Sequence, residues 1–282
     1  MPFDPRPPAP PAPEPTAVAP ATWNALTDSE GRKELIERKI VLPILHRELA
    51  HKHGLAPARA VLLFGPPGTG KTHMARAIAA RLCWALIEAD LSAVARYPVR
   101  LVRLFGQLFA LREVVVFFDE FEQLGMRRAP ENAEGRPVTN EFLKWLDTLS
   151  GGDRLLLVCA TNHIDLLDPA LLRPGRVDFV VPVGPPDAAA RRQMLESYLT
   201  RGEGADVDLE RVVGAAEGLT AADLGEIWNR AAQRAFERDL TSQGAARVTT
   251  DDLLAAVETH RPSLSPDDLA AFEQQVREFA RI

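Results

Sequence analysis

A loop with the residue types and spacing that bind phosphate lies at residues 64–75, FGPPGTGKTHMA. Gly65 is followed by four residues and then by Gly70, Lys71 and Thr72, which matches the phosphate-loop pattern in full. In such loops the backbone N–H groups surround the phosphates, the lysine reaches the outer phosphates and the threonine hydroxyl binds Mg²⁺. We therefore predict that ATP is bound by Gly65, Pro66, Pro67, Gly68, Thr69, Gly70, Lys71, Thr72 and His73.

Two carboxylates and one amide follow apolar segments further along the chain. The run VVVFFDE ends in Asp119 and Glu120, and the run LLLVCATN ends in Asn162. Ligands bind at the carboxyl ends of strands in open parallel sheets. We predict that Asp119 binds Mg²⁺ together with Thr72 and that Glu120 orients and deprotonates the attacking water. Asn162 would align the water or the terminal phosphate if its strand neighbours that of Asp119, whereas a lone asparagine there is more often a turn residue.

Two arginines flank a Pro-Gly turn in LDPALLRPGRVD, residues 167–178. Arginines exposed in this way are usually solvated or form weak surface ion pairs. The functional alternative is that Arg173 and Arg176 reach the nucleotide of a neighbouring subunit, an effect worth roughly a thousandfold in rate. The predicted catalytic residues are Lys71, Glu120, Asn162, Arg173 and Arg176.

A parallel sheet must position these residues. Uninterrupted apolar runs indicate strands that are buried on both faces, and helix-sized intervals between them indicate helices that cover the sheet. The expected fold is α/β, a P-loop NTPase parallel sheet covered by helices and followed by a small all-α lid domain. The apolar segments lie at residues 60–64, 84–89, 114–118, 155–160 and 178–183.

The chain divides by composition into three segments. Nine of the first twenty residues are proline and almost none is a large apolar residue, so residues 1–22 are expected to form a disordered tail. This tail is either a solvated leader or a tether for the aromatic-lined groove of a partner. Residues 23–185 are predicted to form the nucleotide-binding α/β domain, and residues 186–282 a helical lid domain with C-terminal helices.

Capping pairs mark three helix starts in the last segment. In each pair a Thr or Ser is followed three residues later by Asp, which allows reciprocal hydrogen bonds at a helix N-terminus. After the first pair, Leu224, Ile227, Trp228 and Ala231 fall on one helical face. The pairs are Thr220 with Asp223, Thr249 with Asp252, and Ser265 with Asp268.

The composition is that of an ordinary globular protein. Of the 282 residues 46% are hydrophobic and 26% charged, and the net charge of -6 gives no electrostatic reason to expect a nucleic-acid or anionic-membrane partner. No apolar run approaches the roughly 20 residues needed to cross a bilayer, and the N-terminus lacks the apolar core of a signal peptide. Cys83 and Cys159 are expected to be buried free thiols in a reducing cytoplasm.

Four motifs together resemble a known family. GPPGTGKT, VVVFFDE, ATN and LDPALLRPGRVD, in this order and spacing, closely resemble the AAA ATPases within the larger AAA+ group. GLTAADL at residues 218–224 is similar to the lid motif of that family, usually written G-[FY]-[ST]-G-A-D. The C-terminal segment is similar to the C-terminal helices of protein-remodelling members such as katanin and spastin. The resemblance covers residues 23–282.

The resemblance implies a function and a set of roles. It implies a homo-oligomer, a hexameric ring with ATP at each subunit interface, that pulls on a polypeptide and so unfolds it or dismantles a complex. In the terms of the family, Asp119 and Glu120 are the Walker B pair and Asn162 is sensor 1. Arg173 and Arg176 are then arginine fingers acting in trans. The partner outside the ring would be a protein substrate or an adaptor.

The sequence departs from the family pattern in two places. The first pore loop of family members commonly carries an aromatic, an apolar residue and glycine, whereas LSAVARYPVRLVRLF has Tyr97 as its one aromatic before Phe105 and no glycine. Whether Tyr97 grips substrate or is a plain loop tyrosine stays open, and the second pore loop at 127–137 has no decisive residue. Many relatives also have a folded N-terminal domain, so targeting is expected from the tail, an adaptor or a ring surface.

Two other functions compete with protein remodelling. An AAA+ loader or initiator acting on DNA is disfavoured by the acidic net charge and by the absence of a recognisable helix-turn-helix segment. A scaffold that binds ATP without hydrolysing it is disfavoured because the hydrolytic residues are all present.

Overall fold

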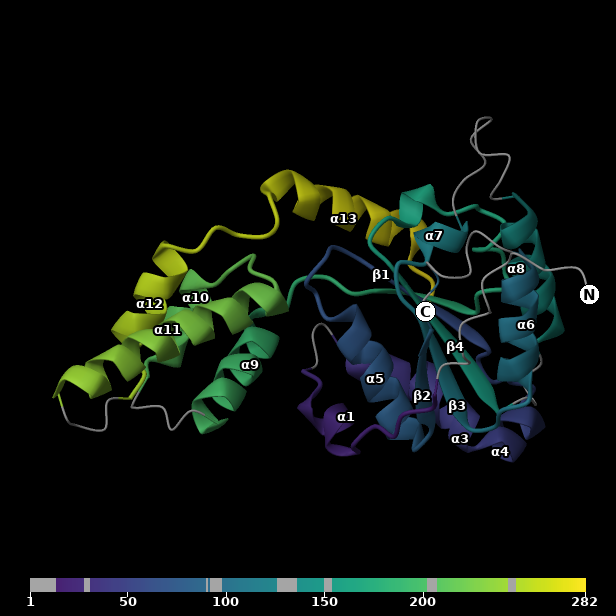
Figure 1. Ribbon diagram of the computed structural model, residues 1–282, viewed down its shortest axis with the longest axis horizontal. Helices are drawn as coiled ribbons and strands as arrows, with labels where there is room; N and C mark the ends of the chain where they lie inside the picture. Colours follow the sequence, from purple (N-terminus) through teal and green to yellow (C-terminus); the bar gives the residue numbers. More distant parts are fainter. Residues whose placement is uncertain are drawn as a thin grey trace, which may run out of the picture.

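The computed structural model describes residues 14–27, 31–89, 91, 98–125, 136–149, 154–201, 207–242 and 247–282. A body built around the sheet lies on the right of Figure 1, and a group of helices lies on the left. One helix, α13, runs across the top from the helical group to the sheet. The predicted division into an α/β part and a helical part is therefore visible in the shape of the molecule.

The central sheet has five parallel strands in the order β2-β3-β4-β1-β5. The predicted α/β fold is confirmed, and each strand lies within the apolar run that predicted it or extends one residue beyond it. The strand that precedes Asn162 is hydrogen-bonded to the strand that precedes Asp119, as the predicted role of Asn162 requires. The strands are β1 (Ala60–Phe64), β2 (Ala85–Ala89), β3 (Val114–Phe118), β4 (Leu155–Thr161) and β5 (Phe179–Pro182).

Helices cover both faces of the sheet. Successive strand residues point to opposite faces, so that α5 (Lys71–Leu82) packs on the side of Val61 and Leu63. On the other side, that of Leu62, lie α6 (Pro98–Phe109) and α8 (Arg136–Thr148). Further short helices are α2 (Arg32–Ile36), η1 (Glu37–Val41), α3 (Leu42–Leu45), α4 (Arg47–Lys52), α7 (Glu122–Gly125) and η2 (Ile164–Leu166).

Four helices form the lid around a core of their own. Leu224, Ile227 and Ala231 are fully buried there, and Trp228 stacks on Tyr198 with ring centroids 5.8 Å apart. The face predicted for this helix is therefore the face that packs. The lid helices are α9 (Ala188–Arg201), α10 (Leu209–Ala215), α11 (Ala221–Ser242) and α12 (Thr250–Glu258).

All three predicted capping pairs form reciprocal hydrogen bonds. In each pair the backbone N–H of the Asp donates to the hydroxyl of the Thr or Ser, and the backbone N–H of that Thr or Ser donates to the carboxylate. Such bonds satisfy N–H groups that a helix leaves free at its start. The pairs begin α11, α12 and α13 (Pro266–Phe279) respectively.

The last helix corrects the predicted extent of the lid, residues 186–282. Instead of joining the lid core, α13 packs on the α/β body: the Phe272 ring lies 6.0 Å from that of Phe64. Val276 and Phe279 continue this apolar face at helical spacing. Gly184 permits the approach, because a Cβ there would lie 2.4 Å from the Phe272 ring.

Two further expectations differ from the structure. Part of the predicted disordered tail, residues 1–22, is ordered: Thr16 exchanges two backbone hydrogen bonds with Leu86 at 2.7 and 2.8 Å, and α1 (Ala21–Ala25) follows. An edge strand offers free backbone groups, which explains this pairing. Cys83, expected to be buried, is exposed at the end of α5, whereas Cys159 is buried, which raises the pKa of its thiol.

Some predicted features lie outside the described residues. These are residues 1–13, Tyr97, and the second pore loop as far as residue 135. Within the part of the chain that the structure describes, no helix combines the length and the apolar character needed to span a bilayer.

Candidate nucleotide site

The phosphate loop connects β1 to α5 and depends on glycine at its first position. Gly65 has φ +151°, and a Cβ there would lie 2.1 Å from the carbonyl oxygen of Val183. The loop is braced internally, because Thr69 Oγ1 donates to the carbonyl oxygen of Pro66 at 2.9 Å. The backbone N–H groups at the start of α5 are therefore presented at the edge of the sheet, where they can bind an anion.

Lys71 is buried at the start of α5. Its Nζ donates to the carbonyl oxygens of Gly65 and Pro66, each at 2.8 Å. Burial lowers the pKa of Lys71 to about 8, against the opposite effect of Asp119 and Glu122, whose negative charges raise it. The ammonium group is thus placed among oxygen atoms in a site that favours an additional negative charge, such as a phosphate.

We expect ATP affinity to fall at alkaline pH because of this lysine. A bound phosphate favours the charged amine, so binding takes up a proton once the pH exceeds the pKa of about 8. Kd for ATP should rise about tenfold between pH 8 and pH 9.5, measured by equilibrium binding in protein that also carries Glu120→Gln. Lys71→Arg is the control, since a guanidinium does not titrate in this range. Equal slopes for the two proteins would contradict the assignment.

Thr72 and Asp119 present oxygen atoms side by side. Thr72 Oγ1 donates to Asp119 Oδ2 at 3.1 Å, and Asp119 Oδ1 accepts the backbone N–H of Glu120 at 2.9 Å. Mg²⁺ is commonly held by one or two protein oxygens together with phosphate oxygens and water. The described residues contain no group of three or more His, Cys, Asp or Glu that could hold a metal by themselves. The pair therefore fits Mg²⁺ held jointly with a nucleotide.

Glu120 and Asn162 complete the polar edge of the sheet. Glu120 is exposed with φ +49°, a left-handed conformation that is costly for a non-glycine residue and is found at functional sites. Its carboxylate accepts a hydrogen bond from Gln123 Nε2. The Asn162 Oδ1 atom is buried and has no hydrogen-bond partner among the described residues. A buried acceptor of this kind needs a donor, and an ordered water or a ligand can supply it.

One cavity of about 490 Å³ brings these groups together. Asp119 and Glu120 come from the end of β3, Asn162 from the end of β4, and Lys71 and Thr72 from the start of α5. The residues fit a magnesium-bound nucleotide, since cationic, oxygen-rich and unpaired acceptor groups face the same space. Of the other predicted residues, the cavity is also lined by Pro67, Gly68, Gly70 and His73.

A second cavity of about 890 Å³ adjoins the first, because both are lined by Gly70, His73 and Ala221. The sequence analysis missed most of its lining. No sequence signal connects these residues, since the segment before α2 meets α9 only after folding. Burial, followed by the effect of Arg76, lowers the pKa of His73 at this boundary. Additional lining residues include Asn24, Leu26, Pro186, Met194 and Tyr198.

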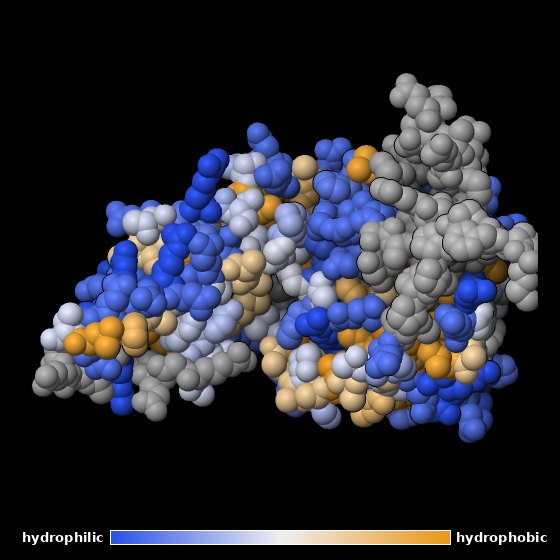
Figure 2. Space-filling model, in the orientation of Figure 1, coloured by the Kyte–Doolittle hydropathy of each residue, from blue (hydrophilic) through white to orange (hydrophobic). Residues whose placement is uncertain are grey.

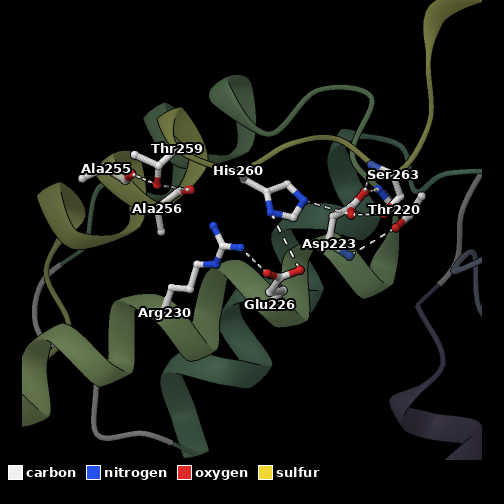
Figure 3. Close-up of polar contacts among 9 residues, drawn as sticks. All are labelled: Thr220, Asp223, Glu226, Arg230, Ala255, Ala256, Thr259, His260 and Ser263. Atoms are coloured by element: carbon white, nitrogen blue, oxygen red, sulfur yellow. Dashed lines mark hydrogen bonds and ion pairs between the residues drawn. The ribbon is translucent and has the colours of Figure 1, made fainter.

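The lid motif touches the phosphate loop directly. The backbone N–H of Ala222 donates to the Gly68 carbonyl oxygen at 3.2 Å, and a Cβ at Gly68 would lie 3.1 Å from Thr220 Oγ1. Asp223, one residue later, accepts hydrogen bonds from Ser263 Oγ, from the Thr220 backbone N–H at 2.9 Å and, at 2.9 Å, from His260 Nε2 (Figure 3). The start of α11 is thereby tied both to the nucleotide site and to the segment before α13.

We expect Asp223→Asn to destabilise the lid at neutral pH by about 2 kcal/mol. Burial alone would raise the pKa of Asp223, but hydrogen bonds from Ser263, Thr220 and His260 lower it to about 2. The folded pKa is depressed, so this stability is present above the ordinary pKa of 3.8 and is lost as the pH falls toward 2. Urea denaturation followed by tryptophan fluorescence at pH 6 and pH 3 measures it.

The same experiment on Asp251→Asn provides the control, because Asp251 is exposed in the first turn of α12. If Asp223→Asn unfolded at the native urea concentration at pH 6, the stabilising role of the carboxylate would be wrong.

Arg173 and Arg176 lie away from this cavity, in the turn before β5. Arg173 is exposed, and neither residue lines the cavity of its own chain. Arg176 Nε donates to Asp147 Oδ1 at 3.0 Å and its Nη1 to the carbonyl oxygen of Ala170 at 2.9 Å. The structure therefore does not bring the two arginines to the nucleotide site of the same chain, and a role in catalysis requires a second subunit.

Comparisons with known proteins agree with this geometry. Residues 61–185 match the model of the ATPase family associated with various cellular activities (AAA). The proteasome-activating nucleotidase of Pyrococcus furiosus is 34% identical over 246 residues, which cover 84% of this chain and 61% of that protein. The "Probable 26S proteasome regulatory subunit 10B" of Caenorhabditis elegans is 34% identical, over 78% of this chain and 57% of that protein.

Among solved structures, the FIGL-1 AAA domain resembles this chain with a TM-score of 0.80 and 26% identity, covering 95% of this chain and 92% of that one. The chain spans about three fifths of the length of the curated relatives. The family match begins in β1 and includes the phosphate loop, the acidic pair and Asn162. The predicted resemblance is confirmed: the chain belongs to the AAA ATPase family.

Proposed function

We propose that this protein hydrolyses ATP with Mg²⁺ and uses the energy to remodel, unfold or disassemble protein substrates. The observation that carries the proposal is the convergence of Lys71, Thr72, Asp119, Glu120 and Asn162 on one cavity. Family membership supports the same reaction, since these residues stand at the positions that AAA ATPases use for it.

Each residue has a distinct task in this mechanism. Lys71 places positive charge beside the outer phosphates, and Thr72 and Asp119 hold the metal. When bound, Mg²⁺ neutralises negative charge on the phosphates and leaving group. Glu120 accepts the proton of the attacking water, while Asn162 orients that water through its unpaired Oδ1 atom. Together these groups position the reactants and stabilise charge in the transition state.

We infer that the working form is a homo-oligomeric ring, and a hexamer by analogy with the family. Arg173 is directed to solvent and would reach the nucleotide of the next subunit. Exposed apolar side chains also support assembly, because they commonly mark protein contacts. Phe236 and Leu240 are exposed at the outer part of α11, where Figure 2 shows hydrophobic colour. Leu45 and Leu49 are exposed on the other domain, as a heterologous ring contact requires.

The proposed partner is a protein substrate or adaptor, and the proposed location is the cytoplasm. The names of the two proteasomal relatives point to protein targets. An AAA+ loader acting on nucleic acid stays the alternative, and the net charge of -6 argues against it.

Capture from native lysate tests the substrate class. Glu120→Gln protein serves as bait with ATP, with and without nuclease, and Lys71→Ala protein is the matched control because it should not hold ATP. Proteins that stay bound after nuclease, and that leave when ATP is withdrawn, would support remodelling. Retention that disappears with nuclease would favour the nucleic-acid alternative.

A further inference from the structure

A single side chain holds both ends of the turn that carries Arg173 and Arg176. Arg281, which follows α13, donates from Nη1 to the carbonyl oxygen of Leu172 at 2.8 Å and from Nη2 to that of Val177. These two carbonyls belong to the residues directly before Arg173 and directly after Arg176. A guanidinium is planar and presents its N–H groups as a rigid fork. The two bonds therefore set the distance between the ends of the turn.

The position of Arg281 does not depend on the turn itself. Its backbone exchanges two antiparallel hydrogen bonds with Val180 of β5, at 2.8 and 3.0 Å. The preceding helix is anchored on the sheet body by Phe272, Val276 and Phe279. The guanidinium is consequently attached to the most rigid part of the molecule and acts from there on a segment with no helix or strand of its own.

The turn has little internal support. Within it the backbone N–H of Arg176 donates to the carbonyl oxygen of Arg173 at 3.2 Å, and Gly175 has φ +91°. Arg59 contacts the middle of the turn through the Gly175 carbonyl oxygen at 2.9 Å, whereas Arg281 contacts its two ends. The direction in which Arg173 leaves the surface is thus decided by contacts from outside the turn.

We propose that Arg281 is a positioning residue for the arginines that complete the nucleotide site of the neighbouring subunit. This inference rests on the proposed function, in which Arg173 and Arg176 act in trans. Removal of the guanidinium leaves the backbone pairing with Val180 in place but releases both ends of the turn. The phosphate loop of the same chain is untouched, so nucleotide binding there is preserved. A displacement of about 1 Å at a positioning group can lower a rate about a hundredfold.

Steady-state kinetics give the first readout. Arg281→Ala is expected to lower kcat for ATP about a hundredfold while Kd for ATP stays within about twofold of native. Arg281→Lys should fall between the two, because an ammonium group lacks the rigid fork. Arg277→Ala is the matched control from the same helix: Arg277 is exposed, pairs only at 3.8 Å with Glu273, and should leave kcat unchanged.

Mixed assemblies separate positioning from a general structural defect. Arg281→Ala subunits have an intact pocket and a misdirected turn, and Lys71→Ala subunits have a defective pocket and an intact turn. Mixing the two should restore part of the ATPase activity, because some interfaces then combine the intact halves. Mixing Arg281→Ala with Arg173→Ala should restore nothing, because every turn in that mixture is defective.

The outcomes distinguish this inference from the proposed function. Native kcat in Arg281→Ala, or no rescue by Lys71→Ala subunits while Arg173→Ala is rescued by them, would overturn the role of Arg281 alone. Rescue of Arg281→Ala by Arg173→Ala would overturn it too. If Arg173→Ala itself is not rescued by Lys71→Ala, action in trans fails, and the role of Arg281 fails with it.

Discussion

Glu120→Gln protein is expected to bind ATP with near-native affinity and to hydrolyse it about a thousandfold more slowly. The amide keeps the shape of the side chain and its contact with Gln123, but it cannot accept the proton of the attacking water. The groups that hold the phosphates and the metal, Lys71, Thr72 and Asp119, are unchanged. Affinity should be measured by equilibrium binding and turnover by phosphate release.

A surface carboxylate supplies the control for this substitution. Glu141 pairs with Lys144 on the exposed side of α8, and Glu141→Gln should hydrolyse ATP at the native rate. Turnover within about threefold of native in Glu120→Gln would remove Glu120 from the role of general base. Loss of ATP binding would instead show that the carboxylate acts on the nucleotide and not on the water.

Arg173→Ala is expected to lower the ATPase rate of the assembly about a thousandfold and to leave ATP affinity unchanged. The reason is geometric: Arg173 is exposed and does not line the cavity of its own chain. Its charge can stabilise the transition state only at another subunit. Activity should reappear in part when Arg173→Ala subunits are mixed with Lys71→Ala subunits, which is checked by titrating one into the other at constant total protein.

Arg176→Ala makes an informative comparison with Arg173→Ala. Arg176 already pairs with Asp147 and the carbonyl oxygen of Ala170, so its removal also weakens the turn from within. We expect Arg176→Ala to lower both the rate and the thermal stability, whereas Arg173→Ala lowers the rate alone. Equal rates for Arg173→Ala and native protein would exclude Arg173 as the group that acts in trans.

Local patterns account for the parts of this protein that could be predicted. The five apolar runs predicted the strands because a strand buried on both faces needs an apolar residue at nearly every position. The three capping pairs predicted helix starts because their hydrogen bonds join residues three apart. The phosphate loop is likewise continuous in sequence, so its residue types and spacing were enough to identify it.

Other features depend on contacts between distant residues. The pairing of Thr16 with Leu86 makes part of the proline-rich segment ordered, although its composition predicts disorder. The second cavity joins Asn24 to Tyr198, and no pattern relates the two. The path of α13 was missed for the same reason: its apolar face would fit either domain, and only the space beside Gly184 selects the sheet body.

The amino-acid sequence by itself determined the fold class, the family and the residues of the phosphate loop and of the strand ends. Each of these is encoded in short runs whose side chains act through local hydrogen bonds or through a repeating pattern of burial. The tertiary structure decided which of these residues face one cavity, that Arg173 and Arg176 face away from it, and that Arg281 holds their turn. Those relations arise from packing between segments far apart in the chain, and packing depends on complementary shape, which no single segment contains.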